Sequence, residues 1–265
     1  MKALLHLLTV LAGTYFLLLV YLYLRQEAFI FFPSKIPVQH HHVLNQYRHA
    51  AISFPAPKST LNGWFIDRGT PLIIYYGGNG EEVSGNLFDV NKFSCGSLLF
   101  VNYRGYGAND GKPTEKNLYT DALSIYDTMV GQYGFNPEQI ILMGRSLGSA
   151  VAVHVAANRR VKAVILITPF NSMVKVGKTH YPLFPLGLLL KHRFDSIKIV
   201  SDLTVPMLTI IAEKDEIIPK ACSLNLLQGW GGSSEMITIK SAGHNDISGY
   251  PEYWRGVNGF LDRQY

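Results

Sequence analysis

The sequence has few of the residues from which metal centres and disulfide frameworks are built. Only two cysteines, Cys95 and Cys222, occur among its 265 residues, and they lie far apart in the chain. Zinc and redox sites require cysteines that are only about two to four residues apart. We therefore expect two buried, unpaired thiols and no metal site.

Charge is also sparse, at 16% of all residues, and it is not clustered. Lysine and arginine outnumber aspartate and glutamate by 24 to 19, which gives a formal net charge of +5. The basic residues stand singly or in pairs such as Arg159 and Arg160. Because nucleic-acid-binding domains gather basic residues into a patch or stripe, the sequence predicts no nucleic-acid partner.

One long apolar run is present near the start of the chain. Within residues 4–24 only His6 can carry a charge. A run of about 20 apolar residues is long enough to span the hydrocarbon core of a bilayer as a helix. Tyr21 and Tyr23 lie at one end of the run, where interfacial aromatic residues are expected. We predict a membrane anchor over residues 1–25 and a single-pass membrane protein.

A cleaved signal peptide is the alternative interpretation of this run. The run is long for a signal peptide, and no cleavage site of the small-x-small type follows it, so an uncleaved anchor is favoured. Lys2 on one side opposes Arg25 and Lys35 on the other. The positive-inside rule therefore leaves open the side of the membrane on which the rest of the chain lies.

The remainder of the chain predicts an α/β fold. Residues 26–48 have no sustained hydrophobic period and are interpreted as a juxtamembrane connector. Across residues 49–265 short apolar runs alternate with longer helix-like segments, which is typical of a mostly parallel sheet flanked by helices. The expected strands are residues 51–54, 61–66, 72–76, 97–103, 140–143, 161–167, 207–212 and 235–239. The expected helices are residues 82–92, 115–133, 147–157, 221–228 and 251–262.

Residues 169–202 interrupt this alternation. They contain Pro182 and Pro185 together with a cluster of apolar residues. The segment is too short to be a separate domain. We interpret it as a small lid inserted into the connections of the sheet.

The pentapeptide Gly-Arg-Ser-Leu-Gly at residues 144–148 carries the first sign of chemistry. It lies between an expected strand and an expected helix, which is the setting that a nucleophilic Gly-x-Ser-x-Gly motif requires. Glycines suit a turn that is strained and closely packed. Ser146 is therefore the predicted nucleophile, and a tight turn with an idle serine is the alternative.

A serine hydroxyl needs a neutral imidazole within reach and a carboxylate that orients the imidazole. In folds that carry this motif, the order along the chain is serine, acid, histidine. Asp215 follows an expected strand, and His244 is the only one of nine histidines downstream of it. We assign these two residues to the acid and the base. Glu213 and Glu216 compete for the acid role, while Asp246 is a second acid or a loop cap.

Hydrolysis also requires N–H donors for the oxyanion of the tetrahedral intermediate. The backbone N–H of Leu147, directly after the serine, is the first expected donor. The second is expected from the glycine-rich loop at residues 77–80, where we favour the backbone N–H of Asn79. A plain glycine turn is the alternative interpretation of this loop.

Several further motifs occur in a fixed order around these residues. They are residues 75–80, 102–107, 111–115, 194–196, 213–219 and 243–246. Together with the serine turn, they resemble the motifs of membrane-anchored ABHD-type α/β hydrolases and their bacterial relatives, over roughly residues 50 to 260. The resemblance implies the α/β-hydrolase fold and a serine hydrolase without a cofactor. It also implies acyl esters, thioesters or lipids as substrates.

Two positions depart from the pattern of that family. Gly77 stands where the family usually has histidine, and Asn102 stands where it commonly has aspartate. Neither is a predicted member of the triad, so the sequence still predicts a membrane-anchored esterase or thioesterase. A serine peptidase of the same fold is one alternative. A non-catalytic membrane-tethered binding module is another, which the ordered Ser146, Asp215 and His244 disfavour.

Overall fold

Eight strands form one sheet within residues 1–57 and 59–264, which the computed structural model describes. The strands are β1 (Ala51–Ala56), β2 (Ser59–Ile66), β3 (Leu72–Tyr76), β4 (Ser97–Val101), β5 (Ile140–Arg145), β6 (Ala163–Ile167), β7 (Met207–Ala212) and β8 (Ser234–Ile239). Their order is β1-β2-β4-β3-β5-β6-β7-β8. β2 runs antiparallel to both β1 and β4, and every other neighbouring pair is parallel. The predicted α/β fold is confirmed, and each expected strand is present with small shifts at its ends.

The central strands are buried on both faces, which explains their unbroken runs of branched apolar residues. In β3, Leu72, Ile74 and Tyr76 belong to one hydrophobic cluster, whereas Ile73 and Tyr75 belong to another. Alternate residues of a strand point to opposite faces of the sheet. The protein therefore has two cores, one on each side of the sheet.

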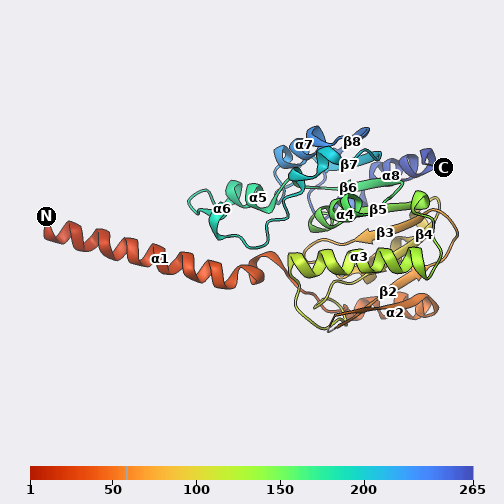
Figure 1. The fold of residues 1–265 in the computed structure, drawn as a ribbon, viewed down its shortest axis with the longest axis horizontal. Helices are drawn as coiled ribbons and strands as arrows, with labels where there is room; N and C mark the ends of the chain where they lie inside the picture. Colours follow the sequence, from red (N-terminus) through yellow and green to blue (C-terminus); the bar gives the residue numbers. More distant parts are fainter. Residues whose placement is uncertain (58, 265) are drawn as a thin grey trace.

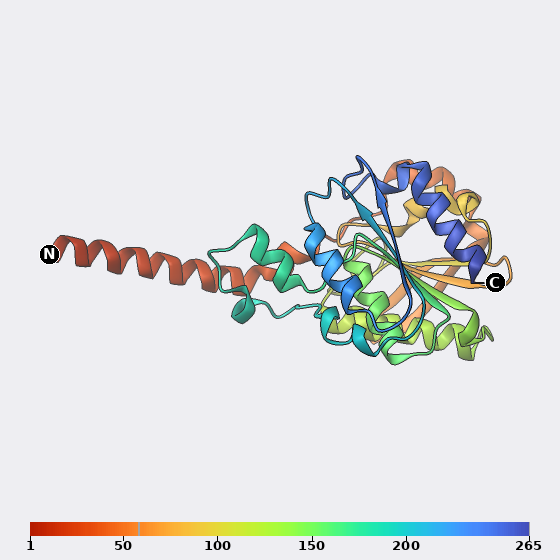
Figure 2. The same ribbon diagram turned by 90° about the horizontal axis from the view of Figure 1, so that it is seen from above.

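Helices cover both faces of this sheet, as Figure 2 shows. They are α3 (Glu115–Gly131), α4 (Leu147–Asn158) and α7 (Lys220–Gly229) on one face, and α2 (His41–Gln46) and α8 (Pro251–Arg263) on the other. The expected helix at residues 82–92 is instead a 3₁₀ helix, Val83–Lys92, on the same face as α8. α3 begins where the Thr114 hydroxyl accepts a hydrogen bond of 3.1 Å from the N–H of Asn117, as an N-cap does.

The order of the strands reverses at β3, because β4 lies on one side of it and β5 on the other. In an open parallel sheet, the crevice at the carboxyl ends of the strands beside such a reversal is the usual ligand site. The loop after β3 and the turn after β5 both lie at this point. The fold thus brings the glycine loop and the serine pentapeptide together.

The apolar run forms part of α1 (Lys2–Ile30), a helix that projects away from the rest of the molecule (Figure 1). Its most apolar window has a mean hydropathy of 2.2 and is not buried against the protein. The helix continues five residues beyond the predicted anchor, and Gln26 and Ile30 are buried. The first five residues of the expected connector, 26–30, therefore belong to α1. The connector also packs on the domain, because Phe31 and Val43 are buried in the two cores.

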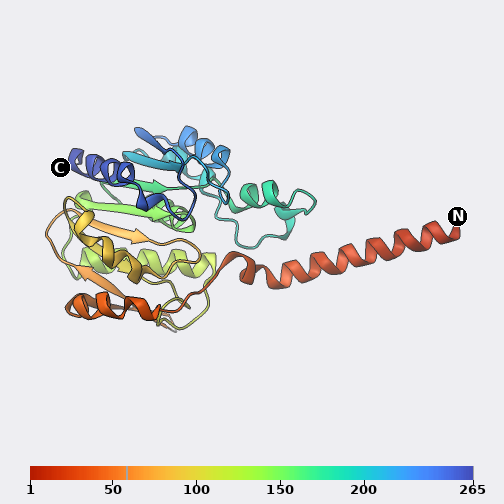
Figure 3. The same cartoon turned by 180° about the vertical axis from the view of Figure 1, so that it is seen from behind.

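The predicted lid connects β6 to β7 and contains α5 (Met173–His180) and α6 (Leu186–Leu189). In Figure 3 it reaches outward from the sheet and lies beside α1. The contacts between these two elements are described below.

Candidate active site

Ser146 lies in a sharp turn between β5 and α4, with φ 51° and ψ −116°. A non-glycine residue rarely adopts a positive φ, and strain of this kind concentrates at functional sites. A Cβ on Gly144 would approach the Gly148 carbonyl oxygen to 2.3 Å, and a Cβ on Gly148 would approach that of Tyr76 to 2.0 Å. Only glycine fits at either position. The turn presents the serine side chain at the carboxyl edge of the sheet.

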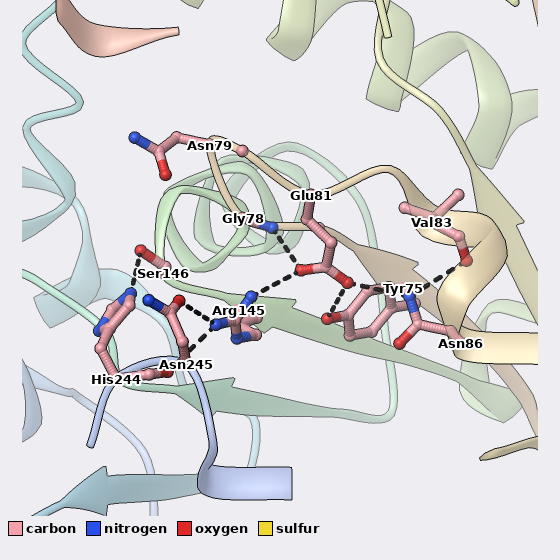
Figure 4. A network of polar contacts seen from close by, with 12 residues as sticks. Tyr75, Gly78, Asn79, Glu81, Val83, Asn86, Arg145, Ser146, His244 and Asn245 are labelled. Carbon is pink, nitrogen blue, oxygen red and sulfur yellow. Dashed lines mark hydrogen bonds and ion pairs between the residues drawn. The ribbon is translucent and has the colours of Figure 1, made fainter. Parts of the chain in front are cut away.

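The three residues expected to form a triad are brought together by this fold. His244 Nε2 lies 3.0 Å from Ser146 Oγ, and His244 Nδ1 lies 2.8 Å from Asp215 Oδ2. Ser146 is 6% exposed and His244 is 3% exposed. Figure 4 shows the serine and the histidine facing each other. If Nδ1 carries the proton, it donates to the carboxylate and leaves Nε2 free to accept from the serine.

The backbone fixes the Asp215 side chain from the opposite side. Its Oδ1 accepts hydrogen bonds from the N–H of Ile217 at 2.9 Å and from that of Ile218 at 2.7 Å. Of the competing carboxylates, Glu213 accepts from the backbone N–H of Ser241 at 3.1 Å. Among the described residues, neither Glu213 nor Glu216 contacts the imidazole, so Asp215 is the carboxylate that faces it.

Asp246 adopts the role of a loop cap. Its Oδ1 accepts a hydrogen bond of 2.7 Å from the N–H of Gly243, one residue before the histidine. The earlier histidines lie elsewhere: His154 stacks on Tyr119 with ring centroids 3.8 Å apart, and His180 contacts the lid side of Ile217. Among the described residues, no group of three or more His, Cys, Asp or Glu side chains is arranged to hold a metal ion.

The two expected oxyanion donors lie beside the serine. Among the described residues, neither the N–H of Leu147 nor that of Asn79 has a hydrogen-bond acceptor. The Asn79 carbonyl oxygen accepts from the N–H of Phe32 at 3.1 Å and from the hydroxyl of Tyr106. Its side-chain Nδ2 donates to the carbonyl oxygen of Ile30 at 3.2 Å. The loop is thus tied to the end of α1 while its N–H remains free.

A partly buried ion pair that sequence reasoning missed connects three loops of the site (Figure 4). Arg145 Nη1 lies 3.0 Å from Glu81 Oε2, and the two side chains are 19% and 16% exposed. Arg145 Nη2 also donates to the His244 carbonyl oxygen at 3.1 Å and to Asn245 Oδ1 at 2.9 Å. Glu81 Oε2 accepts from the N–H of Gly78 at 2.8 Å. The pair joins the glycine loop, the serine turn and the histidine loop.

The surroundings of Glu81 keep its carboxylate charged. Burial acts to raise its pKa, but the Arg145 charge and hydrogen bonds from Asn86, Gly78 and Tyr75 outweigh burial and hold the pKa below its ordinary value. Burial acts to lower the pKa of Arg145, and Glu81 raises it above its ordinary value. The only sequence signal for this pair was an arginine inside the serine pentapeptide.

Gly77 and Asn102, the two residues that depart from the family pattern, both make hydrogen bonds. The Gly77 carbonyl oxygen accepts a hydrogen bond of 3.0 Å from the Tyr103 hydroxyl. Asn102 Oδ1 accepts from the N–H of Val83 at 3.0 Å, and its Nδ2 donates to Glu82 Oε1 at 2.6 Å. An aspartate at position 102 would set a second carboxylate against Glu82. The amide instead satisfies both neighbours.

A cavity of about 550 Å³ opens beside the serine. Its walls come from the segment after α1, the glycine loop, the serine turn and the loops that carry the acid and the histidine. Lys35, Arg145 and Asn245 supply polar groups to the wall, and Ile217 supplies an apolar one. Ser146, His244 and Asn79 all line this cavity.

Comparison with known proteins identifies the family and the fold of this chain. The sequence profile of the serine hydrolase family matches residues 126–262. An uncharacterised protein of Mycobacterium tuberculosis is 30% identical over 86% of this chain and 83% of its own length. Human α/β hydrolase domain-containing protein 17B is 32% identical over 79% of this chain and 68% of its own length. A solved structure of the Pyrococcus furiosus esterase Pf2001 superposes with a TM-score of 0.69 and 16% identity, covering 88% of this chain and 98% of that one.

The fold and the family match define an enzyme of the serine hydrolase class with the α/β-hydrolase fold. Within that class, the chain belongs to the ABHD-type α/β-hydrolase family, as the relatives in M. tuberculosis and human indicate.

Proposed function

We propose that this enzyme hydrolyses acyl esters or thioesters through a Ser146–His244–Asp215 triad and an acyl-enzyme intermediate. The observation that carries the proposal is the continuous chain of hydrogen bonds from Asp215 Oδ2 through the imidazole to Ser146 Oγ. Ser146 Oγ attacks the acyl carbonyl carbon while its proton passes to His244 Nε2. That proton then goes to the leaving alcohol or thiol.

Water completes the reaction. His244 takes a proton from a water molecule, whose oxygen attacks the acyl carbon of the intermediate. The bond to Ser146 Oγ breaks, the serine regains a proton from the imidazolium, and a carboxylic acid leaves. Asp215 stabilises the imidazolium in both halves of the reaction without itself taking the proton.

The N–H groups of Asn79 and Leu147 are the proposed oxyanion hole. Both lack other acceptors among the described residues, so they are available without rearrangement when negative charge develops on the carbonyl oxygen. A preorganised donor of this kind is worth about 3 kcal/mol of transition-state stabilisation. Since both donors are backbone groups, their position depends on the loops that hold them.

We further propose that α1 anchors the enzyme in a membrane. The helix has 29 residues, and its apolar surface is exposed rather than covered by the protein. An anchored enzyme meets substrates in or at the bilayer, which makes lipid esters and acylated proteins the proposed substrate class. Thioester cleavage would act on acyl groups attached to cysteine.

Reaction with a fluorophosphonate probe tests the triad directly. The full-length enzyme should be labelled covalently, and the Ser146→Ala variant should not. Ser149→Ala is the matched control, because this serine lies one turn away and only donates to the Ser146 carbonyl oxygen. Labelling that persists in Ser146→Ala would contradict the assignment of the nucleophile.

Turnover of p-nitrophenyl esters of increasing chain length then separates the possible activities. An esterase or thioesterase cleaves these esters and acyl thioesters. Hydrolysis of amino-acid amides without hydrolysis of esters would indicate a peptidase instead. A labelled enzyme with no turnover on any of these substrates would contradict the proposed substrate class.

A further inference from the structure

The lid and α1 lie side by side (Figures 1 and 3) and are in contact at several places along the helix. The Tyr15 hydroxyl donates a hydrogen bond of 2.7 Å to the Leu183 carbonyl oxygen, and the Tyr15 ring stacks on that of Phe184. Closer to the domain, Gln26 Nε2 donates to the Leu189 carbonyl oxygen at 3.2 Å. The lid therefore runs along α1 rather than folding back over the domain.

The spacing of these contacts determines how deep the lid lies. Tyr15 and Gln26 are 11 residues apart, which corresponds to about 16 Å along a helix. If the lid and its contacts with Tyr15 lay in water, only residues 2–14 would remain to span the membrane. Those residues extend about 20 Å, whereas the hydrocarbon core is about 30 Å thick. A spanning α1 thus requires that the tip of the lid lies below the membrane surface.

The side chains of the lid fit such a position. Leu183 is 82% exposed, Leu188 is 87% exposed and Tyr181 is 60% exposed, all next to the exposed apolar surface of α1. An apolar patch that continues a membrane-binding surface marks a further site of membrane contact. The described part of the chain leaves most of the surface of these three side chains uncovered.

Most backbone N–H groups of the lid tip are already hydrogen-bonded, as insertion into an apolar environment requires. Of residues 181–190, Pro182 and Pro185 have no N–H, and six of the other eight donate it to carbonyl oxygens of residues 177–186. The exposed Leu183 carbonyl oxygen accepts from Tyr15. Unpaired backbone groups are costly in hydrocarbon, so this pairing removes the main obstacle to insertion.

The residues at the base of the lid carry positive charge, which suits contact with an anionic membrane surface. No aspartate or glutamate occurs in residues 169–194, while Lys175 and Lys178 are exposed. Lys191 lies over the ring of Tyr23 at 4.1 Å from its centroid. Basic residues beside an inserted apolar segment are attracted to anionic lipid headgroups.

We infer that residues 181–189 form a second membrane-inserting element, which enters the bilayer beside α1 and docks the active site on the lipid surface. The inference rests on the proposed anchoring by α1. His180, at the base of this element, lies with its Nε2 2.8 Å from the Ile217 carbonyl oxygen, and Ile217 lines the cavity at Ser146. The base of the inserted lid is thus in contact with a residue of the cavity wall, so the cavity lies close to the bilayer from which acyl chains would enter.

Fluorescence of the full-length protein in lipid vesicles tests this placement. Single cysteines, Leu183→Cys and Leu188→Cys, are introduced into a Cys95→Ser, Cys222→Ala background and labelled with a polarity-sensitive fluorophore. The vesicles contain phosphatidylcholine, phosphatidylglycerol and a lipid with a nitroxide on its acyl chain. Leu11→Cys in α1 is the membrane control, and the exposed Tyr133→Cys beyond α3 is the aqueous control. Thermal unfolding verifies that each labelled variant is folded.

The expected result is blue-shifted emission and nitroxide quenching at positions 183 and 188, of the same order as at position 11. Position 133 should show neither. Quenching at position 11 without quenching at 183 and 188 would overturn the lid insertion and leave the anchor intact. If position 11 also remained unquenched, both the anchor and the lid insertion would be overturned.

Discussion

At the scale of single residues, position in the backbone decides which of several similar side chains can act. Glu213, Asp215 and Glu216 lie within four residues of one another, yet only Asp215 contacts the imidazole. Two backbone N–H groups hold its other oxygen, so the carboxylate presents Oδ2 to His244 in one orientation. A precise orientation of this kind selects one tautomer of the histidine.

Asp215→Asn tests that role. The amide oxygen can keep the two backbone hydrogen bonds, but its NH₂ would face Nδ1 and favour the wrong tautomer. We expect kcat to fall by about 10³- to 10⁴-fold with a small change in KM and in thermal stability. Steady-state kinetics on a soluble ester measure this loss. Asp246→Asn is the control, because its amide oxygen can still cap Gly243, and a comparable loss there would contradict the assignment.

Glu81→Gln tests the buried ion pair through the dependence of stability on pH. The pKa of Glu81 is lower in the folded protein than in the unfolded chain. The charged carboxylate therefore contributes fully to the free energy of unfolding above the ordinary carboxyl pKa, and this contribution is lost as pH falls through the pKa of the folded protein. At neutral pH we expect the free energy of unfolding of the Glu81→Gln variant to be about 1–3 kcal/mol lower than that of the unmodified protein.

Denaturant unfolding from pH 7 down to about pH 3, across the ordinary carboxyl range, measures the difference between the two proteins. The difference in the free energy of unfolding between the unmodified protein and Glu81→Gln should be constant near neutral pH and should become smaller at acidic pH. A difference that stays constant down to the acid limit would show that Glu81 is not charged in the folded protein. Reduced kcat at neutral pH is also expected, because the pair positions the Gly78 N–H and the histidine loop.

At the scale of elements, the site depends on how closely β3, β5 and α4 approach one another. The first turn of α4 passes so near to the end of β3 that position 148 has no space for a side chain. This contact sets the distance between the N–H of Leu147 and the glycine loop. The proposed oxyanion donors come from separate elements, and their separation is fixed by backbone packing.

Gly148→Ala should therefore disrupt both packing and catalysis. The added Cβ would meet the Tyr76 carbonyl oxygen at 2.0 Å, and backbone atoms cannot move aside as a side chain can. We expect a loss of about 3 kcal/mol or more in the free energy of unfolding, together with loss of esterase activity. Gly131→Ala is the control, because nothing lies within 4 Å of its Cβ position at the end of α3. Equal stability of the two variants would contradict this account.

At the scale of the whole molecule, the helix that leaves the domain is joined to the site. Asn79 contacts Ile30 and Phe32 directly after α1, and the Ser34 hydroxyl donates to the Gly80 carbonyl oxygen at 3.1 Å. The glycine loop is thus held by the segment that continues the proposed anchor. Ser34 and Lys35 of that segment line the cavity, and the lid and α1 project from the same end of the molecule (Figure 2).

Retention of α1 in the mature protein distinguishes an anchor from a signal peptide. We expect the full-length protein to stay in the membrane fraction after alkaline extraction, with an intact mass that includes residues 1–25. Deletion of residues 4–24 should let alkaline extraction release the protein, because it removes the one segment of the described chain that is long enough to span the bilayer, and the short lid cannot span it alone. A mature chain that begins after the apolar run would contradict the anchor.

Much of the fold was predictable because hydrophobic pattern reports burial. The runs in β3, β5 and β7 are buried on both faces, and each was expected as a strand. The end of α1 was harder to predict, because Gln26 is polar and its side chain makes hydrogen bonds to the lid, 163 and 165 residues away in the chain. The 3₁₀ helix at Val83–Lys92 was expected as an α-helix, since hydrophobic period alone does not separate the two.

Some residues of the candidate site could likewise be proposed from the sequence, whereas others could not. Ser146, Asp215 and His244 could be proposed from residue type, from the strand before each loop and from their order in the chain. Their catalytic roles remain predictions, although the fold brings them within hydrogen-bond distance. The Glu81–Arg145 pair was not foreseen, because a buried ion pair depends on the meeting of loops 64 residues apart.

Local chemistry in the sequence specifies the strands, the glycines of the serine turn and the apolar run of α1. Three-dimensional packing selects the carboxylate that faces the imidazole, brings Glu81 and Arg145 together and places the lid beside α1. Hydrophobic period and turn chemistry act between near neighbours in the chain, whereas ion pairs and the contacts of the lid with α1 join residues far apart. Such contacts exist only once the whole chain has packed.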